Sequence, residues 1–313
     1  MRRAPNSGRA SSPPDGGRRI RGNGVNSSGS GRWRSRTATV LLLLPAGSWY
    51  ALLLLAPLVI LIVFSFGGRA PEGGYLPAFT LANYQELPTR STAFLNALWM
   101  ATGGTLLCLF VGFPLAYYLA TRAGSKRTLL LVLVVVPFWT SFLIRTYAWL
   151  TILGNNGIPA FLESLGFDHV VLLNTPFAVM LGIVYNYLPL MVFPLYVSLE
   201  RLDKRLIEAS KDLGAGRLAT FRQVTLPLCS AGLLSGVILV FIPIMGEYII
   251  PALLGGGKVF FIGNALVDLF LQSRNWPFGS AAAIVLILVI LAAVTVYLRL
   301  GSRGQGTREV SLL

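Results

Sequence analysis

Apolar residues are gathered into six long runs along the chain, separated by short polar segments. Each run is long enough to cross a bilayer as a helix, which takes about 20 residues. The runs are continuous rather than alternating, which argues against a transmembrane barrel. Because a backbone inside a bilayer must satisfy its own hydrogen bonds, each run is expected to be helical. The predicted spans are residues 40–66, 94–120, 128–153, 176–199, 228–254 and 278–298.

The composition agrees with this pattern. The 313 residues are 54% hydrophobic and 12% charged, whereas soluble domains carry about 25% charged residues. A single apolar run is compatible with a buried helix of a soluble protein, but six such runs are not. The sequence therefore predicts an all-α, polytopic membrane protein with six transmembrane helices.

The distribution of Lys and Arg predicts the orientation. With the N-terminus inside, the cytoplasmic segments hold 21 of the 26 basic residues and the outer loops hold four. Cytoplasmic loops of membrane proteins are enriched in Lys and Arg. We therefore expect both termini to be cytoplasmic, and we attribute the net charge of +14 to topology rather than to binding of nucleic acid.

The ends of the chain differ from its middle. Residues 1–39 are rich in Arg, Gly, Ser and Pro, which predicts a basic, disordered cytoplasmic tail. This tail either orients the first span or also binds anionic lipid headgroups. The run that follows is too long for a cleaved signal peptide, so we interpret it as an uncleaved anchor. The transmembrane domain is predicted over residues 40–300, and residues 301–313 form a short cytoplasmic tail.

The residue types that carry enzyme chemistry are sparse. Cys108 and Cys229 lie in or at the edge of apolar runs and are interpreted as packing residues. His169, the single histidine, is interpreted as a solvated loop residue. The "GGGKV" segment at Lys258 has neither the spacing nor the hydroxyl of a phosphate-binding loop. We therefore expect no catalytic residues, no metal site and no nucleotide site on this chain.

A polar insert at residues 200–227 interrupts the apolar pattern between the fourth and fifth spans. It predicts a helix capped by Asp203 and ended by Gly214 in the left-handed conformation. A second short helix is predicted near Arg217–Val224, with Pro227 in the first turn of the fifth span. An apolar stripe follows the first helix at Leu202, Leu206, Ala209 and Leu213. The stripe packs either on the protein itself or in the groove of a partner, and the residues alone leave both open.

The insert "EASKDLGAGRLATFRQVTLP" resembles the E-A-A-x3-G-x9-I-x-L-P signature of the permease subunits of bacterial ABC importers. The spacing matches throughout, with Ser210 in place of the second Ala and Val224 in place of Ile. In that family this loop is a coupling helix that docks on a cytoplasmic ATPase subunit. The coupling residues implied by the resemblance are Glu208, Ala209, Ser210, Asp212, Gly214, Val224, Leu226 and Pro227.

Further segments, among them "PFWTSFLIRTYAWL", "GEYIIPALLGGG" and "NWPFGSA", resemble the spermidine/putrescine-type permeases over roughly residues 40–300. The resemblance implies a type I ABC importer permease in the bacterial inner (cytoplasmic) membrane. The implied solute is a polyamine, and the alternatives are an opine, an amino-acid derivative, iron or an organic anion.

The same resemblance implies several partners. These are ATPase subunits that bind ATP and Mg²⁺, a second permease subunit, an extracytoplasmic substrate-binding protein and membrane lipid. The second permease is expected to be a different chain rather than a copy of this one. No cofactor is expected on this chain.

Two charged residues, Arg145 and Glu247, lie within predicted spans, where an ionised side chain is costly and is a functional candidate. Counted from the inner ends of their spans they sit at similar depth, in the outer half of the membrane. Two interpretations stay open. Either they form a structural ion pair, or Glu247 faces the solute pathway and meets a cationic group. The other candidate pathway residues are Trp139, Tyr185, Asn186 and Tyr187, which are also compatible with packing or interface anchoring.

Proline and glycine residues inside the spans predict their packing. Prolines within three of the predicted spans are typical of kinked helices around a cavity, and they are Pro137, Pro189, Pro194, Pro243 and Pro251. Gly232 and Gly236 form a GxxxG motif, which favours close helix approach. A secondary transporter is a weaker alternative, because no internal repeat or set of mid-membrane carboxylates is evident. A membrane enzyme is disfavoured by the lack of clustered His, Asp or Cys.

Overall fold

The computed structural model describes residues 30–167 and 170–302. The described residues are helical apart from one two-stranded hairpin and the connecting loops, so the predicted all-α class is confirmed. The chain divides into two units, Met1–Ala56 and Pro57–Leu313. Most of the two predicted tails, and His169, lie outside the described residues.

Helix α1 (Ser30–Ser65) covers the first predicted span. It begins earlier than residue 40, within the segment that the sequence predicted as a tail. The side chains from Leu43 to Leu55 are exposed and mostly apolar. A helix with such a surface is suited to contact with lipid.

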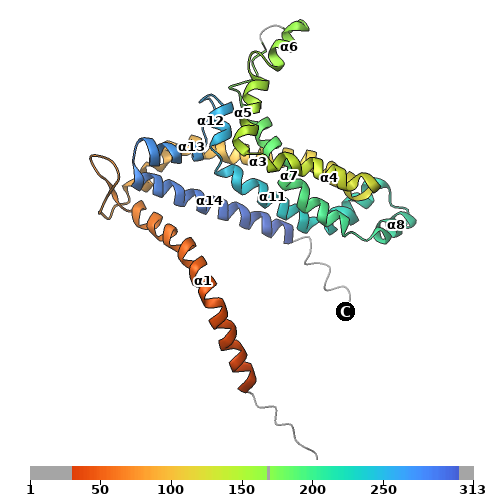
Figure 1. Ribbon diagram of the computed structural model, residues 1–313, viewed down its shortest axis with the longest axis horizontal. Coiled ribbons are helices and arrows are strands. Elements are labelled where there is room, and N and C mark those ends of the chain that lie inside the picture. Colours follow the sequence, from red (N-terminus) through yellow and green to blue (C-terminus); the bar gives the residue numbers. More distant parts are fainter. Residues whose placement is uncertain (1–29, 168–169, 303–313) are drawn as a thin grey trace, which may run out of the picture. The chain divides into compact units, whose positions relative to one another are not determined.

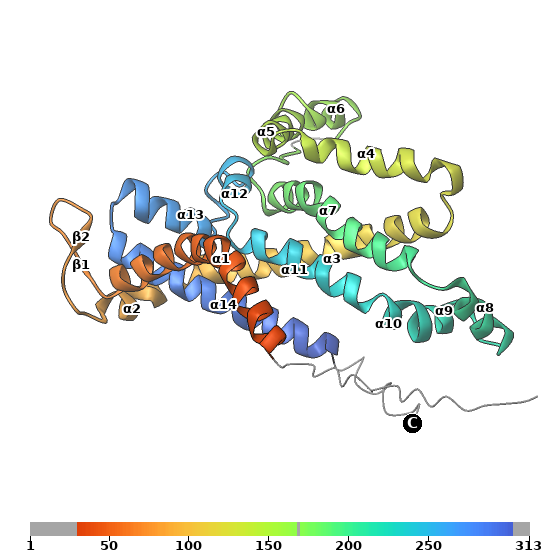
Figure 2. The same ribbon diagram turned by 60° about the horizontal axis from the view of Figure 1, so that its bottom comes forward.

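Four long helices build the second unit, and Figures 1 and 2 show them running along one another. They are α3 (Ser91–Thr121), α7 (Pro176–Glu200), α11 (Ser230–Met245) and α14 (Trp276–Ser302). Helix α3 packs against both α7 and α11, and α14 packs against α11. The bounds of α3, α7 and α14 agree closely with the second, fourth and sixth predicted spans.

Glycines allow α11 to approach α7. A β-carbon on Gly232 would lie 2.4 Å from Cβ of Ser198, and one on Gly236 would lie 2.8 Å from the sulfur of Met191. Both distances are shorter than atoms tolerate, so the backbones meet only because these side chains are absent. The close approach predicted from the GxxxG motif is confirmed.

The third predicted span, residues 128–153, is not continuous. It consists of α4 (Arg127–Trp139) and α5 (Phe142–Leu153), and these helices with their short extensions are bent by 92°. Pro137 lies in the last turn of α4, the backbone of Thr140 is extended, and that of Ser141 is not helical. The kink predicted from Pro137 is present, but it is a break between two helices, because a proline near the helix end and the non-helical residues after it interrupt the hydrogen-bond ladder.

The fifth predicted span, residues 228–254, is also broken. Helix α11 ends at Met245, and α12 (Ile249–Leu254) begins after Glu247. A second bend of 68° lies at Cys229, between the helical segment Arg217–Leu228 and α11. The sequence suggested that Pro227 lies in the first turn of the fifth span. It instead precedes this bend and lies outside α11. Among the described residues, four helices are long enough to cross a membrane, or up to six if each bent pair is one span.

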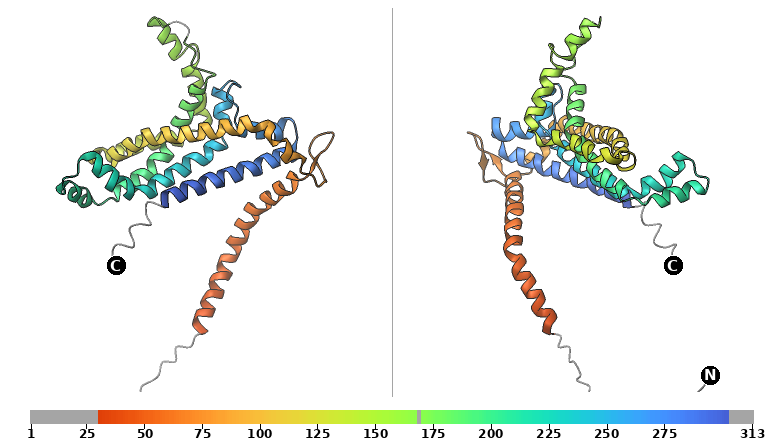
Figure 3. Two further views of the ribbon diagram at one scale, coloured as in Figure 1. Left: turned by 180° about the vertical axis from the view of Figure 1, so that it is seen from behind. Right: turned by 45° about the vertical axis from the view of Figure 1, so that its right-hand side comes forward.

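The remaining elements connect these helices. They are β1 (Gly68–Arg69), β2 (Tyr75–Leu76), α2 (Ala82–Glu86), η1 (Leu87–Arg90), η2 (Gly124–Lys126), α6 (Ile158–Ser164), α8 (Lys204–Asp212), α9 (Arg217–Thr220), η3 (Phe221–Thr225), α10 (Leu226–Leu228), α13 (Ile262–Val267) and η4 (Asp268–Gln272). The antiparallel strands lie at one end of the helical bundle and the α8–α10 segment lies at the other (Figures 2 and 3).

Candidate functional site

The polar insert forms a helical hairpin whose first arm is α8. Oδ1 of Asp203 accepts a hydrogen bond from the N–H of Arg205 at 2.9 Å and so caps the start of the helix, as predicted. At the other end Gly214 has φ +84°. Its N–H donates to the carbonyl of Lys211, and the next N–H donates to the carbonyl of Ser210. This paired arrangement is a Schellman motif, which confirms the predicted role of Gly214 in ending α8.

The second arm consists of α9, the π-helical turn η3 and α10, so it is longer than the predicted helix. The hydroxyl groups of Ser210 and Thr220 lie 3.1 Å apart and join the two arms. Ser210 occupies the position where the signature has Ala, so the departure from the signature adds a hydrogen bond. The ring of Phe221 packs edge-on against that of Phe113 in α3, with centroids 5.3 Å apart. The hairpin is therefore anchored to the transmembrane bundle through its second arm.

Three leucines in α8, in α9 and in the turn between them are exposed. Leu213 has 89% of its surface accessible, Leu218 has 70% and Leu206 has 48%. Glu208 and Asp212 lie on the same helix and are also exposed. Exposed leucines flanked by charges on a stiff helical hairpin are typical of a docking surface.

The three C-terminal residues of the signature lie closer to the bundle. Val224 and Pro227 are half-buried. Leu226 lines an apolar groove of about 720 Å³ together with Phe110 and Phe113 of α3. These residues join the hairpin to the membrane helices rather than extending its exposed surface.

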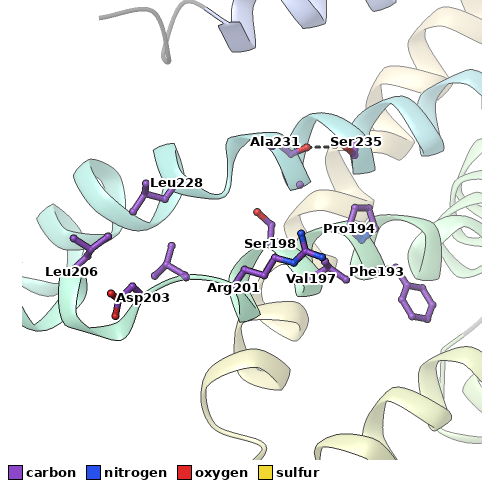
Figure 4. Close-up of a pocket in the computed structure, with 12 residues that line it drawn as sticks. Phe193, Pro194, Val197, Ser198, Arg201, Asp203, Leu206, Leu228, Ala231 and Ser235 are labelled. Atoms are coloured by element: carbon purple, nitrogen blue, oxygen red, sulfur yellow. Dashed lines mark hydrogen bonds between the residues drawn. The ribbon is translucent and has the colours of Figure 1, made fainter. Parts of the chain in front are cut away.

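A second groove, of about 740 Å³, lies where the hairpin meets α7 and α11 (Figure 4). Its lining includes Leu206 from α8, Val197 from α7 and Ser235 from α11. Arg201, the residue that follows α7, also lines it. Figure 4 shows these side chains spread along the two long helices and the start of the hairpin. The groove thus separates the start of α8 from the ends of α7 and α11.

The candidate pathway residues surround the breaks in the helices. The hydroxyl of Tyr187 donates a hydrogen bond to Oε2 of Glu247. Oε1 of Glu247 accepts from the N–H groups of Tyr248, Ile249 and Ile250 at 3.0, 2.8 and 3.3 Å, at the start of α12. Both oxygens of this buried carboxylate are thus engaged within the fold.

Arg145 is not paired with Glu247 in the described part of the chain. It is buried in α5, with its Cζ atom 5.6 Å from the ring centroid of Phe138 and 5.9 Å from that of Phe142. The equal depth expected from the sequence did not produce an ion pair, because depth does not specify which way a side chain points around its helix.

The other three candidate pathway residues differ in environment. Trp139 is 82% exposed at the end of α4. Tyr185 is exposed, and its ring packs edge-on against Trp149, with centroids 5.4 Å apart. Asn186 is buried and donates to the carbonyl of Gly182 at 2.9 Å. Trp139 and Tyr185 therefore offer aromatic surface, whereas Asn186 is held within α7.

Two residues that the sequence analysis missed support the break at Glu247. A β-carbon on Gly263 would lie 2.5 Å from the carbonyl oxygen of Glu247, so α13 presses directly on this backbone. The side-chain amide of Asn264 donates to the carbonyl of Tyr248 at 2.8 Å, and its oxygen accepts from the N–H of Phe261. The only signal in the sequence is a Gly-Asn pair inside the apolar segment "FFIGNALV".

Comparison with known proteins identifies the kind of chain. Residues 109–303 match the family described as binding-protein-dependent transport system inner membrane component. The spermidine/putrescine transport system permease protein PotB of Haemophilus influenzae is 40% identical over 260 residues, which cover 80% of this chain and 90% of that protein. The protein of the same name from Escherichia coli is 41% identical over 256 residues, covering 80% and 93% of the two chains.

Solved structures show the same fold. A chain of a bacterial ABC transporter that imports the acidic polysaccharide alginate superposes with a TM-score of 0.64. It is 20% identical, and the alignment covers 87% of this chain and 98% of that one. A second structure of a bacterial alginate ABC transporter, in complex with a periplasmic protein that holds an alginate pentasaccharide, gives a TM-score of 0.65.

Proposed function

The chain belongs to the family of binding-protein-dependent transport system inner membrane components, and on this premise we propose that the solute it carries is a polyamine of the spermidine/putrescine type. It is a permease subunit of an ABC importer in the inner membrane and not an enzyme. The main support for this solute is the 41% identity to a spermidine/putrescine permease across 93% of that protein.

The proposed assembly contains this chain, a second and different permease chain, two ATPase subunits and an extracytoplasmic binding protein. A transporter of the same fold is described in complex with a periplasmic protein, which supports the last of these partners. ATP and Mg²⁺ bind to the ATPase subunits. Membrane lipid surrounds the apolar exterior of the permease.

The α8–α10 hairpin is the proposed contact with the ATPase. Its exposed leucines, Leu206, Leu213 and Leu218, enter an apolar groove on that subunit, and Glu208 and Asp212 contact its polar rim. ATP shifts the permease only if the ATPase binds one conformation of the hairpin more tightly than the other. The contact of Phe221 with Phe113 of α3 provides the route by which this preference reaches the membrane helices.

The proposed solute path passes the breaks between α4 and α5 and between α11 and α12. Exposed aromatic rings such as Trp139 and Tyr185 attract ammonium groups through their π faces. Glu247 is assigned a positioning role in this path, because its oxygens already cap α12 and bond Tyr187. A polyamine thus meets rings rather than a free carboxylate at this depth.

Uptake of radiolabelled spermidine and putrescine by cells that lack this gene, and by the same cells with the gene restored, tests the proposal. Restoration is expected to recover energy-dependent uptake of at least one polyamine. Unlabelled polyamines are expected to compete, whereas an opine or an organic anion is not. Uptake that is unchanged by loss of the gene, or that is restored only for a non-polyamine solute, would reject the polyamine assignment.

A further inference from the structure

Arg145 is a buried cation without a countercharge in the described residues. Only 8% of its surface is accessible, and its Nε atom is buried with no hydrogen-bond partner. Among residues 43–167 and 170–299, whose side chains the structure describes, the ion pair found is that of Arg127 with Glu200, and none involves Arg145. A guanidinium carries five N–H donors in a fixed fork that matches a carboxylate. This side chain is therefore an oxyanion site that the fold of this subunit leaves unfilled.

The neighbours of Arg145 do not replace such a ligand. The rings of Phe138 and Phe142 lie over the guanidinium at 5.6 and 5.9 Å. Ring faces attract a cation, but they accept none of its N–H groups. Glu247, the other charged residue at this depth, already accepts hydrogen bonds from Tyr187 and from the start of α12. The fold thus holds its own buried carboxylate away from its buried arginine.

The side chains around Arg145 are apolar or aromatic, and they are exposed on this subunit. Phe138, Ile144 and Tyr147, which flank Arg145 in sequence at the elbow between α4 and α5, are all exposed. Lipid tails cover apolar rings well, but they supply no acceptor to a buried guanidinium. A second protein chain can both cover the exposed rings and provide a carboxylate to the guanidinium.

We propose that the ligand of Arg145 is an Asp or Glu side chain of the second permease subunit, which packs against the elbow between α4 and α5. This inference rests on the proposed function, since only an importer assembly contains that subunit. The solute is excluded as the ligand, because a polyamine carries ammonium groups and no oxyanion. The resulting intersubunit ion pair joins the two permeases beside the solute path.

Charge reversal in the assembled importer tests the pair. Arg145→Glu is expected to lower polyamine uptake about thirty-fold or more, as does loss of one partner of a buried charge pair. Each intramembrane Asp or Glu of the second permease is then changed to Arg in the Arg145→Glu background. One of these changes is expected to restore at least a tenth of wild-type uptake.

Two controls stay within this chain. Arg127→Glu with Glu200→Arg reverses a pair whose partners both belong to this subunit, so its uptake shows how far a correct reversal rescues. Asp168→Arg in the Arg145→Glu background examines a carboxylate that lies outside the described residues. Rescue by Asp168→Arg, rescue by no residue of the second permease, or normal uptake by Arg145→Glu alone would each overturn the proposal.

A second readout separates this inference from the assignment of the solute. The permease subunits are purified together with their ATPase, and co-purification and ATPase activity are measured without any solute. Arg145→Glu is expected to release the second permease, and the reversing partner to retain it. If the wild-type assembly is intact but carries no polyamine, the polyamine assignment fails while the ion pair is still judged by retention of the second permease.

Discussion

The hydroxyl of Tyr187 in α7 is hydrogen-bonded to the carboxylate of Glu247, which lies in the break between α11 and α12. This contact joins the centre of one long helix to the point at which another changes direction. Because the second carboxylate oxygen caps α12, the side chain of Glu247 fixes the direction of the short helix relative to α7. The break is held by side chains rather than being a flexible joint.

Tyr187→Phe removes this hydrogen bond and leaves one oxygen of a buried carboxylate unpaired. We expect the free energy of unfolding to fall by about 1–3 kcal/mol. Thermal unfolding of the purified protein in nanodiscs measures the change. Glu247→Ala is expected to be more damaging, since it also removes the cap of α12.

Tyr185→Phe is the matched control, because Tyr185 is exposed and lies two residues away on the same helix. It is expected to change the free energy of unfolding by less than about 0.5 kcal/mol. Equal effects of the two substitutions would show that the contact between Tyr187 and Glu247 does not stabilise the fold.

Gly214→Val places a β-branched side chain at φ +84°, although no neighbouring atom lies within 4 Å of its β-carbon. The cost is therefore conformational, about 1–2 kcal/mol or more. The Schellman turn is expected to rearrange, which re-aims Leu213. ATPase activity of the reconstituted importer is expected to become insensitive to the loaded binding protein, while membrane insertion is retained.

Gly216→Ala provides the comparison. Gly216 has φ −66° and the same open surroundings, so alanine is expected to be tolerated there. If Gly214→Val keeps wild-type stimulation, the turn at the end of α8 is not required for coupling.

Leu213→Glu tests the proposed docking surface. With 89% of its surface accessible, this side chain contributes little to the fold, so the thermal midpoint is expected to stay within error of the wild type. Binding of the ATPase subunit is expected to weaken about ten-fold or more, as for an apolar anchor at an interface. Titration of the ATPase against permease in nanodiscs measures the affinity.

Leu165→Glu is the control for a charge introduced at an exposed leucine elsewhere. Leu165 follows α6, which lies away from the α8–α10 hairpin (Figure 1). Its variant is expected to bind the ATPase normally. Equal loss of affinity in both variants would argue against docking through the hairpin.

Gly232→Ala is expected to destabilise the contact of α11 with α7 by about 1–3 kcal/mol. The added carbon would lie 2.4 Å from Cβ of Ser198 and 2.5 Å from the carbonyl oxygen of Pro194, so the backbones must separate. Gly47→Ala in α1 has no atom within 4 Å and is expected to be neutral or slightly stabilising. Thermal unfolding in nanodiscs compares the two, and a stable Gly232→Ala variant would contradict the packing.

The sequence predicted those elements that depend on local pattern. The span at residues 176–199 corresponds to α7 almost residue for residue. Thr175 and Pro176 define its start, and the end of the apolar run defines its end. The end of α8 at Gly214 was predicted for the same reason, since glycine is the residue that tolerates a left-handed backbone. The coupling role of the hairpin residues stays a prediction.

Hydropathy alone does not predict the breaks in two of the spans. Residues 128–153 and 228–254 are apolar throughout, and hydropathy does not register a change in helix direction. The separate partners of Arg145 and Glu247 depend on how α5 and the break after α11 are oriented against α7, which only tertiary packing decides. Prolines 137 and 243 gave the approximate places of the breaks but not their angles.

The π-helical turn at Phe221–Thr225 holds one residue more than an α-helical turn would. Its N–H to carbonyl bond spans five residues, from Leu226 back to Phe221, whereas an α-helical turn closes over four. Removing one residue from this turn is therefore expected to return it to α-helical winding while α9 and α10 nearly keep their orientation about the helix axis. The same deletion within α9, which has no extra residue, would rotate the residues on either side of it by about 100° relative to one another. As such permeases diverge, this turn is thus expected to be the place where the hairpin tolerates a change in length.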